Sequence, residues 1–285
     1  MIKRREFLMS SAAALASARA WGEAAGQAKL DRIAVMSSTF LPLLKGMARA
    51  GNPKATLDLM DLPGMVAERF AIHRVEFQHM DFPSTESAYL EEFRARLKKA
   101  NAQISQITLD FANLNVSSPD PVILLETIEL TKRWIDYAVA LGCPRIMAQA
   151  GDLAPKVRDS AIATLKTINR YARAKKVSVN LQNRPGNPGW ETIVEVVKAA
   201  GISADPDCGN FPDQPSRAAG LAAMYRVAGS SHIQHLPGKF DTAEAIRISK
   251  EQGFKGIYTI EVPAGNGPDP CAPVEPVLNV LLANI

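Results

Sequence analysis

The chain has 285 residues, of which 47% are hydrophobic and 22% are charged, and its formal net charge is +4. This length suits one large domain or two small ones. The first twenty residues supply three of the four positive charges, because they hold Lys3, Arg4, Arg5 and Arg19 against Glu6. The rest of the chain is therefore close to neutral, and we expect no nucleic-acid partner.

The N-terminal segment has the organisation of an export signal. Arg4 and Arg5 precede an apolar, alanine-rich run, and Ala18-Arg19-Ala20 ends it with the small-x-small pattern that a signal peptidase cleaves. The paired arginines resemble a twin-arginine signal. The alternative, an amphipathic helix, lacks a polar face. We expect a signal peptide at residues 1–20, a short linker at 21–28, and a periplasmic or extracellular mature protein. No other segment predicts a permanent membrane anchor.

Short apolar or β-branched runs then alternate with longer helical patterns along the whole chain. One helical stripe consists of Leu90, Phe93 and Leu97, with apolar residues three and four positions apart. Gly142 and Gly201 each follow such a pattern and precede a strand, as a left-handed helix cap does. The predicted strands are residues 33–37, 74–77, 104–109, 145–149, 177–182, 202–205, 232–236 and 256–261.

Eight strands that alternate with helices predict a parallel sheet with right-handed crossovers, closed into a barrel. The first strand runs into residues 37–40 without a GxGxxG motif, which disfavours a dinucleotide-binding open sheet. No linker or composition break divides the chain. We therefore expect the α/β fold class, with a single (β/α)8 barrel domain of TIM type over residues 29–285.

Polar side chains stand at the predicted strand ends, where a β/α barrel carries its active site. Each has a structural alternative: Asp110 and Asp207 could cap the following turn, and His235 could be a rim histidine. Together, carboxylates with an imidazole or amide at one mouth indicate a site for a hard divalent cation. The residues are Glu76, Asp110, Gln149, Gln182, Asn183, Asp207, Asn210, Gln234, His235 and Glu261.

Four short motifs resemble the strand ends of the sugar phosphate isomerase/epimerase superfamily. They are Val75-Glu76, Asp207-Cys208-Gly209-Asn210, Ile233-Gln234-His235 and Tyr258-Thr259-Ile260-Glu261. This superfamily shares the xylose isomerase-like barrel and includes enzymes of the endonuclease IV type. The resemblance implies a divalent metal (Mn²⁺, Mg²⁺, Co²⁺ or Zn²⁺) held by Glu, Asp, His and Glu from the fifth to eighth strands. It also implies two glutamates that act as opposed acid and base in the epimerases.

Carried over by position, the ligand set differs from the family pattern. Asp207 and Glu261 match the sixth- and eighth-strand ligands, whereas the fifth-strand glutamate is Gln182. The seventh-strand ligand is Gln234 or His235, depending on the strand register, because a slip by one residue changes the face of the sheet. A glutamine has no proton equilibrium near neutral pH and cannot act as a general base.

We therefore expect catalysis at Glu261 and Gln182, with Glu261 as the base and the metal as a Lewis acid. The expected partner is a small-molecule carbohydrate, and the activity that of a sugar isomerase or epimerase. A keto-glycoside lyase and a non-catalytic sugar-binding barrel remain alternatives, and the oligomeric state stays open. An endonuclease IV-like site is disfavoured by the small number of histidines. The expected substrate-binding residues are Glu76, Gln149, Asn183, Asn210 and Lys239.

Overall fold

A computed structural model describes residues 26–46, 55–184, 189–236, 238–263, 269 and 271–285. The expected signal peptide and most of the expected linker lie outside these residues. Within them, eight parallel strands form one sheet in the order β6-β5-β4-β3-β2-β1-β8-β7. The strands are β1 (Ile33–Met36), β2 (Arg74–Gln78), β3 (Gln103–Thr108), β4 (Arg145–Ala148), β5 (Ser178–Gln182), β6 (Ser203–Asp205), β7 (Ser230–Ile233) and β8 (Ile257–Ile260).

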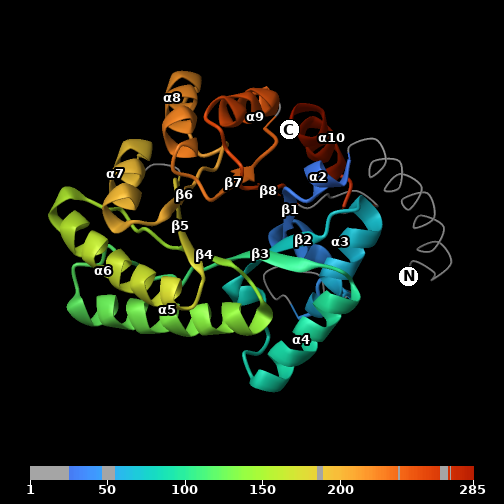
Figure 1. The fold of residues 1–285 in the computed structure, drawn as a ribbon, viewed down its shortest axis with the longest axis horizontal. Coiled ribbons are helices and arrows are strands. Elements are labelled where there is room, and N and C mark those ends of the chain that lie inside the picture. Colours follow the sequence, from blue (N-terminus) through green and yellow to red (C-terminus); the bar gives the residue numbers. More distant parts are fainter. Residues whose placement is uncertain (1–25, 47–54, 185–188, 237, 264–268, 270) are drawn as a thin grey trace.

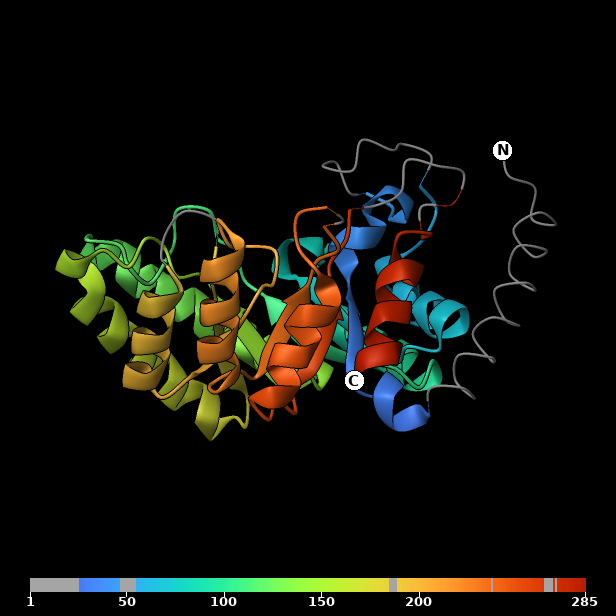
Figure 2. The same cartoon turned by 90° about the horizontal axis from the view of Figure 1, so that it is seen from above.

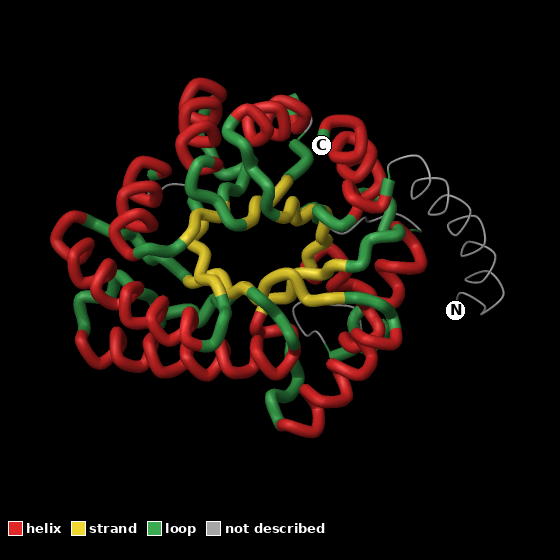
Figure 3. The backbone as a smooth tube through the Cα atoms, viewed as in Figure 1, coloured by secondary structure: helices red, strands yellow, loops and turns green. Residues whose placement is uncertain are grey.

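The sheet curls into a nearly closed barrel with helices around its outside (Figures 1 and 3). Each strand pairs in parallel with its neighbour in that order, and isolated bridges join Ala204 to Ala228 and Asp207 to His232 between β6 and β7. A view from the side shows the helices running along the strands (Figure 2). The single-domain (β/α)8 barrel predicted from the alternation of elements is confirmed.

The helices that cover the barrel follow the strands in sequence. They are α2 (Gln27–Leu30), α3 (Leu62–Phe70), α4 (Ser87–Lys99), α5 (Pro121–Leu141), α6 (Pro155–Ala174), α7 (Trp190–Ala200), α8 (Gln214–Tyr225), α9 (Thr242–Glu251) and α10 (Val274–Asn284). Short 3-10 helices follow β1 (η1, Ser37–Leu43), precede α3 (η3, Leu59–Asp61) and follow β2 (η4, His79–Asp81). In the described part of the chain, no helix has the length and hydropathy needed to cross a membrane.

The helix ends show how the sequence sets these boundaries. Gly142 and Gly201 end α5 and α7 with φ angles of 74° and 70°, the left-handed conformation predicted for them. On α4, Leu90, Phe93 and Leu97 are all buried, as their spacing predicted. The apolar core thus lies between the helix ring and the outer face of the barrel.

The interior of the barrel is unusually polar. Barrels of this type are normally filled with Val, Ile and Leu, but here charged and amide side chains lie buried at inward positions of the strands. Glu76, Asn180, Asp205 and His232 are each no more than 1% exposed. Such groups are costly to bury unless they bind one another or a ligand. The interior therefore indicates where the chemistry of the molecule is concentrated.

Candidate active site

Three side chains from consecutive strand ends meet at the mouth of the barrel. Asp207 follows β6, His232 lies in β7 and Glu261 follows β8, and each offers a ligand atom within 4.8 Å of the other two. Nδ1 of His232 lies 3.0 Å from Oε2 of Glu261. The backbone fixes this arrangement, because Cys208 N donates to His232 O (3.1 Å) and Glu261 N donates to Ile233 O (3.1 Å).

Asp207 is held by a set of amide donors. Its Oδ1 accepts from Gly209 N, and its Oδ2 accepts from Nδ2 of Asn210, both at 2.8 Å. The side chain of Asn183 binds the backbone of the same turn: its Oδ1 accepts from Asp207 N (2.8 Å), and its Nδ2 donates to Asp207 O (3.2 Å). Asn183 and Asn210 were predicted to bind substrate; the structure shows them positioning Asp207.

Burial and the nearby Glu261 carboxylate raise the pKa of Asp207 to about 7, although His232 and the amide donors act in the opposite direction. A buried carboxylate next to a second carboxylate retains its charge at neutral pH only if a cation balances it. A positive charge close to Asp207 would therefore favour its ionised form.

The side chains of two glutamines also lie next to the Asp207 carboxylate. Nε2 of Gln234 donates to Asp207 Oδ2 at 2.8 Å, and Nε2 of Gln182 lies 3.5 Å from the same oxygen and 2.7 Å from Nδ1 of His232. Gly209 is required here because a Cβ at that position would overlap the amide group of Gln234. Each amide nitrogen faces the cluster, so each amide must rotate to present its oxygen to a cation.

His232 is bound on both sides of its ring. Nε2 lies 2.9 Å from Glu76 Oε1, and Glu76 is held in turn by Thr108 (2.6 Å), Gln106 (3.0 Å) and Thr259 (2.8 Å). Burial lowers the pKa of His232, but the carboxylates of Glu76, Asp205 and Glu261 outweigh it and raise the pKa well above its ordinary value. These carboxylates therefore favour the protonated form of the ring.

Glu76 is the reciprocal partner of that ring. Burial opposes ionisation of Glu76, but the charge of His232 and hydrogen bonds from His232, Thr108 and Gln106 lower its pKa to about 2. The side chain is fully buried, and both of its oxygens are used inside the barrel. Glu76 was expected to bind sugar hydroxyls, but the structure places it below the mouth, where it orients His232.

Three predicted residues lie away from this cluster. His235 points to α9, with Nδ1 3.5 Å from Thr242 Oγ1, so the register of the seventh strand brings Gln234 to the mouth instead. Lys239 is exposed, and its Nζ lies 4.8 Å from the ring centre of Phe240. Gln149 ends β4 on the opposite side of the mouth.

Sequence reasoning missed His232, although its signal was present. The seventh strand was predicted at residues 232–236, whereas β7 occupies Ser230–Ile233. Side chains two residues apart share a face of a strand. Of the two registers left open, the one in which Gln234 faces the mouth therefore implied that His232 faces the barrel interior directly below it.

The donor set suits a divalent cation. Two carboxylates and an imidazole provide oxygen and nitrogen ligands, and Gln182 and Gln234 can add amide oxygens. A metal-binding histidine characteristically donates its other ring N–H to a carboxylate, which Glu76 accepts here. Such a cation would have to displace a proton from Nδ1 of His232, so its binding should release a proton.

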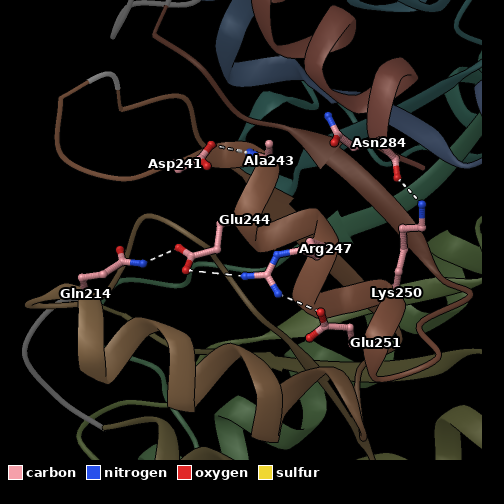
Figure 4. A pocket seen from close by; sticks show the side chains of 8 residues that line it. All are labelled: Gln214, Asp241, Ala243, Glu244, Arg247, Lys250, Glu251 and Asn284. Carbon is pink, nitrogen blue, oxygen red and sulfur yellow. Dashed lines mark hydrogen bonds and ion pairs between the residues drawn. The ribbon is translucent and has the colours of Figure 1, made fainter.

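An open groove lies elsewhere, on the outside of the barrel between α8, α9 and α10 (Figure 4). Its volume is about 660 Å³, and Glu244, Arg247 and Glu251 line its centre. These charges pair with one another: Arg247 Nη1 donates to Glu251 Oε1 at 2.7 Å, and Glu244 contacts both Gln214 and Arg247. This groove is therefore a solvated helix junction, separate from the buried cluster.

Comparison with known proteins places this geometry in context. Residues 67–279 match the family model described as xylose isomerase-like TIM barrel. No curated protein matches the sequence. Among solved structures, a D-psicose 3-epimerase from Clostridium cellulolyticum H10, determined with D-tagatose, is 12% identical with a TM-score of 0.67, and the match covers 89% of this chain and 96% of that one.

Two further structures have the same fold. A xylose isomerase domain protein from Planctomyces limnophilus is 16% identical, with a TM-score of 0.64 over 89% of this chain and 97% of that chain. A xylose isomerase-like TIM barrel protein from Mycobacterium smegmatis, solved in complex with magnesium, is 19% identical, with a TM-score of 0.62 over 79% and 88%. At these identities, the likeness concerns the fold.

Proposed function

This chain belongs to the family of xylose isomerase-like TIM barrels, and on that premise we propose that it is a sugar isomerase or epimerase that requires a divalent metal. The proposed substrate is a small carbohydrate that carries an aldehyde or ketone group, that is, an aldose or a ketose. The observation that carries the proposal is the convergence of Asp207, His232 and Glu261 at the barrel mouth. A D-psicose 3-epimerase and a magnesium-bound barrel among the structural neighbours support it.

In this proposal, Asp207, His232 and Glu261 hold the metal, with amide oxygens of Gln182 and Gln234 as further donors. A bound divalent cation supplies Lewis-acid polarisation of a substrate carbonyl or hydroxyl oxygen. Glu76 keeps the imidazole of His232 in place through Nε2, and Asn183 and Asn210 fix the turn that carries Asp207. These contacts keep the ligands in position before substrate arrives.

Glu261 is the proposed base. Its side chain is 31% exposed, whereas Asp207 and Glu76 are buried, so it is the member of the acidic cluster that substrate can reach. It removes the proton from the carbon beside the carbonyl, exchanges it with solvent, and delivers a proton to the former carbonyl carbon. The hydroxyl proton moves between the two oxygens, so ketose becomes aldose without net oxidation.

Gln182 limits the mechanism to one base. At this position an amide can bind a metal or a sugar hydroxyl, but it cannot accept a proton near neutral pH. Epimerisation by proton transfer on opposite faces of the substrate would need two such bases, so of the two activities the proposed mechanism covers isomerisation. The same substitution favours a second candidate function, a non-catalytic barrel that binds sugar.

The test uses purified protein with Mn²⁺ and a panel of ketoses and aldoses, followed by NMR in D₂O. We expect isomerisation with deuterium incorporated at the carbon next to the carbonyl, and its loss in Glu261→Gln. Glu275→Gln, an exposed glutamate on α10, is the matched control and should retain activity. If the protein binds sugars but no divalent metal supports deuterium incorporation, the result would contradict the proposed isomerase activity and support a non-catalytic sugar-binding barrel.

We also propose that the protein is exported through its paired arginines. The support is the sequence pattern at residues 1–20. Replacing Arg4 and Arg5 with lysines should leave the precursor in the cytoplasm, as cell fractionation would show. Unchanged export of that variant would contradict the twin-arginine route.

A further inference from the structure

A second set of polar side chains follows β3, β4 and β5, the strands that continue the sheet beyond β6. Asp110 follows β3, Gln149 follows β4 and Arg184 follows β5. These strands are neighbours in the sheet. Arg184 pairs with Asp110, so the guanidinium reaches past the end of β4, where Gln149 lies. The three side chains thus come from one continuous arc of the barrel rim.

The guanidinium of Arg184 has only one, distant ion-pair partner among the described residues. Its Nη1 lies 3.6 Å from Oδ2 of Asp110, too far for a hydrogen bond, and both side chains are 36% exposed. Within the described residues, Arg184 makes no hydrogen bond and no other ion pair. An arginine offers five N–H donors in a planar fork that matches a carboxylate or a phosphate. Asp110 therefore holds this fork in place without satisfying it.

Gln149 presents an unmet acceptor on the same arc. Its Oε1 is buried and has no hydrogen-bond partner among the described residues. Buried polar atoms in native proteins are normally paired, and an unpaired one needs an explanation. A sugar hydroxyl would provide the missing donor.

The arc is continuous with the proposed active site. Asn183, the residue before Arg184, contacts the backbone of Asp207 and Asn210. A molecule bound at Asp207 and Glu261 can therefore extend across the mouth toward Arg184.

We propose that Arg184, with Gln149 beside it, is the specificity-determining residue of this site and selects a carbohydrate that carries an anionic group, a carboxylate or a phosphate ester. The guanidinium binds the anion with paired N–H donors, and Gln149 accepts a hydrogen bond from a neighbouring hydroxyl. Asp110 competes with the anion for Arg184. This inference rests on the proposed function in that it places the reacting end of the sugar at Glu261.

The test compares D-fructose, D-fructuronate and D-fructose 6-phosphate, which differ only in carrying a hydroxymethyl group, a carboxylate or a phosphate ester at one end. Isothermal titration calorimetry with the Mn²⁺-loaded and the metal-free full-length protein should give at least one anionic sugar an affinity about tenfold above that of D-fructose. Whether fructuronate or the phosphate ester is preferred identifies which anion the site takes.

Two substitutions should change the preference for an anionic sugar in opposite directions. Arg184→Gln should reduce the preference to within about twofold, and Asp110→Asn should increase it, because the competing carboxylate is removed. Arg158→Gln is the matched control, since Arg158 is also partly exposed and paired with one carboxylate, but on the outer helix α6. Arg184→Lys keeps the charge without the fork and should retain part of the preference, which covers the case in which Arg184→Gln does not fold.

Equal binding of all three sugars by the unmodified protein would overturn the proposal, and so would an equal loss in the Arg184 and Arg158 variants. The measurements distinguish failure of the anion-recognition proposal from failure of the proposed isomerase function. Isomerisation of neutral sugars without any anion preference would refute the role of Arg184 alone. An Arg184-dependent preference for an anionic sugar that no metal converts would refute the isomerase and leave this recognition arc in place.

Discussion

At the scale of single residues, the site depends on side chains that never touch substrate. His232 has two ring nitrogens with different tasks: Nδ1 faces Glu261, and Nε2 faces Glu76. Glu76 is anchored by Thr108 and Thr259, which leave it one orientation. The imidazole is thus aimed at the mouth by a carboxylate on the far side of the barrel.

Replacing Glu76 by Gln should therefore weaken Mn²⁺ binding although the residue is not a ligand. We expect a loss of about 10- to 100-fold in affinity, the usual effect of removing a partner of a metal-binding histidine. Titration calorimetry measures it, with Glu91→Gln on the exposed face of α4 as the control. An unchanged Mn²⁺ affinity in Glu76→Gln would show that His232 is not a ligand.

Asp207 gives a prediction for pH. Its pKa is raised from 3.8 to about 7 by burial and by Glu261, so between these values the folded protein binds this proton more tightly than the unfolded chain. The free energy of unfolding should therefore fall as pH rises through this range in the absence of metal. Asp205, whose pKa is also raised by burial and by Glu76, acts in the same direction.

Glu76 and His232 also have shifted pKa values, but they change the free energy of unfolding mainly outside the pH range in which Asp207 acts. Glu76, with a pKa lowered to about 2, adds stability as pH rises from there to about 4.5, whereas His232 loses its contribution between its ordinary pKa of 6.5 and its raised pKa. Urea unfolding between about pH 4.5 and about pH 6.5 isolates the carboxyl effect. Asp207→Asn should flatten the slope; a stability that rises with pH in the unmodified protein would contradict the assignment.

At the scale of elements, one buried arginine joins α8 to the loops beside the site. Arg217 is 0% exposed, donates to Cys208 O and Asp241 O at 2.8 Å each, and pairs with Glu244 at 3.0 Å. Cys208 follows Asp207 directly. The position of a ligand turn is therefore tied to a helix on the outside of the barrel.

Arg217→Met should cost roughly 3–5 kcal/mol of folding free energy, because it leaves buried acceptors and Glu244 without a partner. Arg226, exposed just after the same helix and bonded to Gln252, is the matched control, and Arg226→Met should change stability by less than about 0.5 kcal/mol. Chemical denaturation compares the two. Similar small losses in both variants would show that Arg217 does not support the loops.

The bounds of the strands show how much of the fold can be predicted from the sequence. Seven strands begin and end within one residue of their predicted bounds, because each is a short run between helices with clear apolar periodicity. The exception is β7, where Ser230 and Ser231 look polar but lie buried, with Ser230 bonded to Asp205 and Ser231 to Tyr225. Local propensity cannot reveal that a serine is satisfied by a partner distant in the chain.

The same limit applies to the site. Asp207, Glu261 and Gln182 were predictable because each stands at the end of an apolar run. His232 was not, because its importance comes from Glu76, 156 positions away in the sequence. Arg184 likewise gains its meaning from Asp110, which pairs with it across the end of an intervening strand. Strand ends identify candidates, whereas contacts across the barrel assign their roles.

At the scale of the whole molecule, the site lies on the seam that closes the barrel. Between β6 and β7, isolated bridges replace a continuous ladder, and one of them joins Asp207 to His232. Four backbone bonds cross this seam: Ala204 N to Val227 O, Gly229 N to Ala204 O, His232 N to Pro206 O and Cys208 N to His232 O. A cation bound by residues of both sides would therefore cross-link the least continuous part of the sheet.

Divalent metal should accordingly slow amide exchange across the seam. We expect the amides of Gly229, His232 and Cys208 to gain protection on addition of Mn²⁺, and those of β2 and β3, which pair through five residue pairs with one register shift, to change little. Hydrogen exchange with mass spectrometry distinguishes the two regions. Equal protection of both would indicate general stabilisation without a cross-link.

The central claim is that Asp207, His232 and Glu261 form one metal centre. Crystals grown with Mn²⁺ and measured for anomalous scattering test it most directly. We predict a single strong anomalous peak at the barrel mouth, bonded to both carboxylates and to Nδ1 of His232, with Nε2 still bound to Glu76. A structure in which Nδ1 of His232 stays bound to Glu261, with no anomalous peak between these three residues, would contradict the claim.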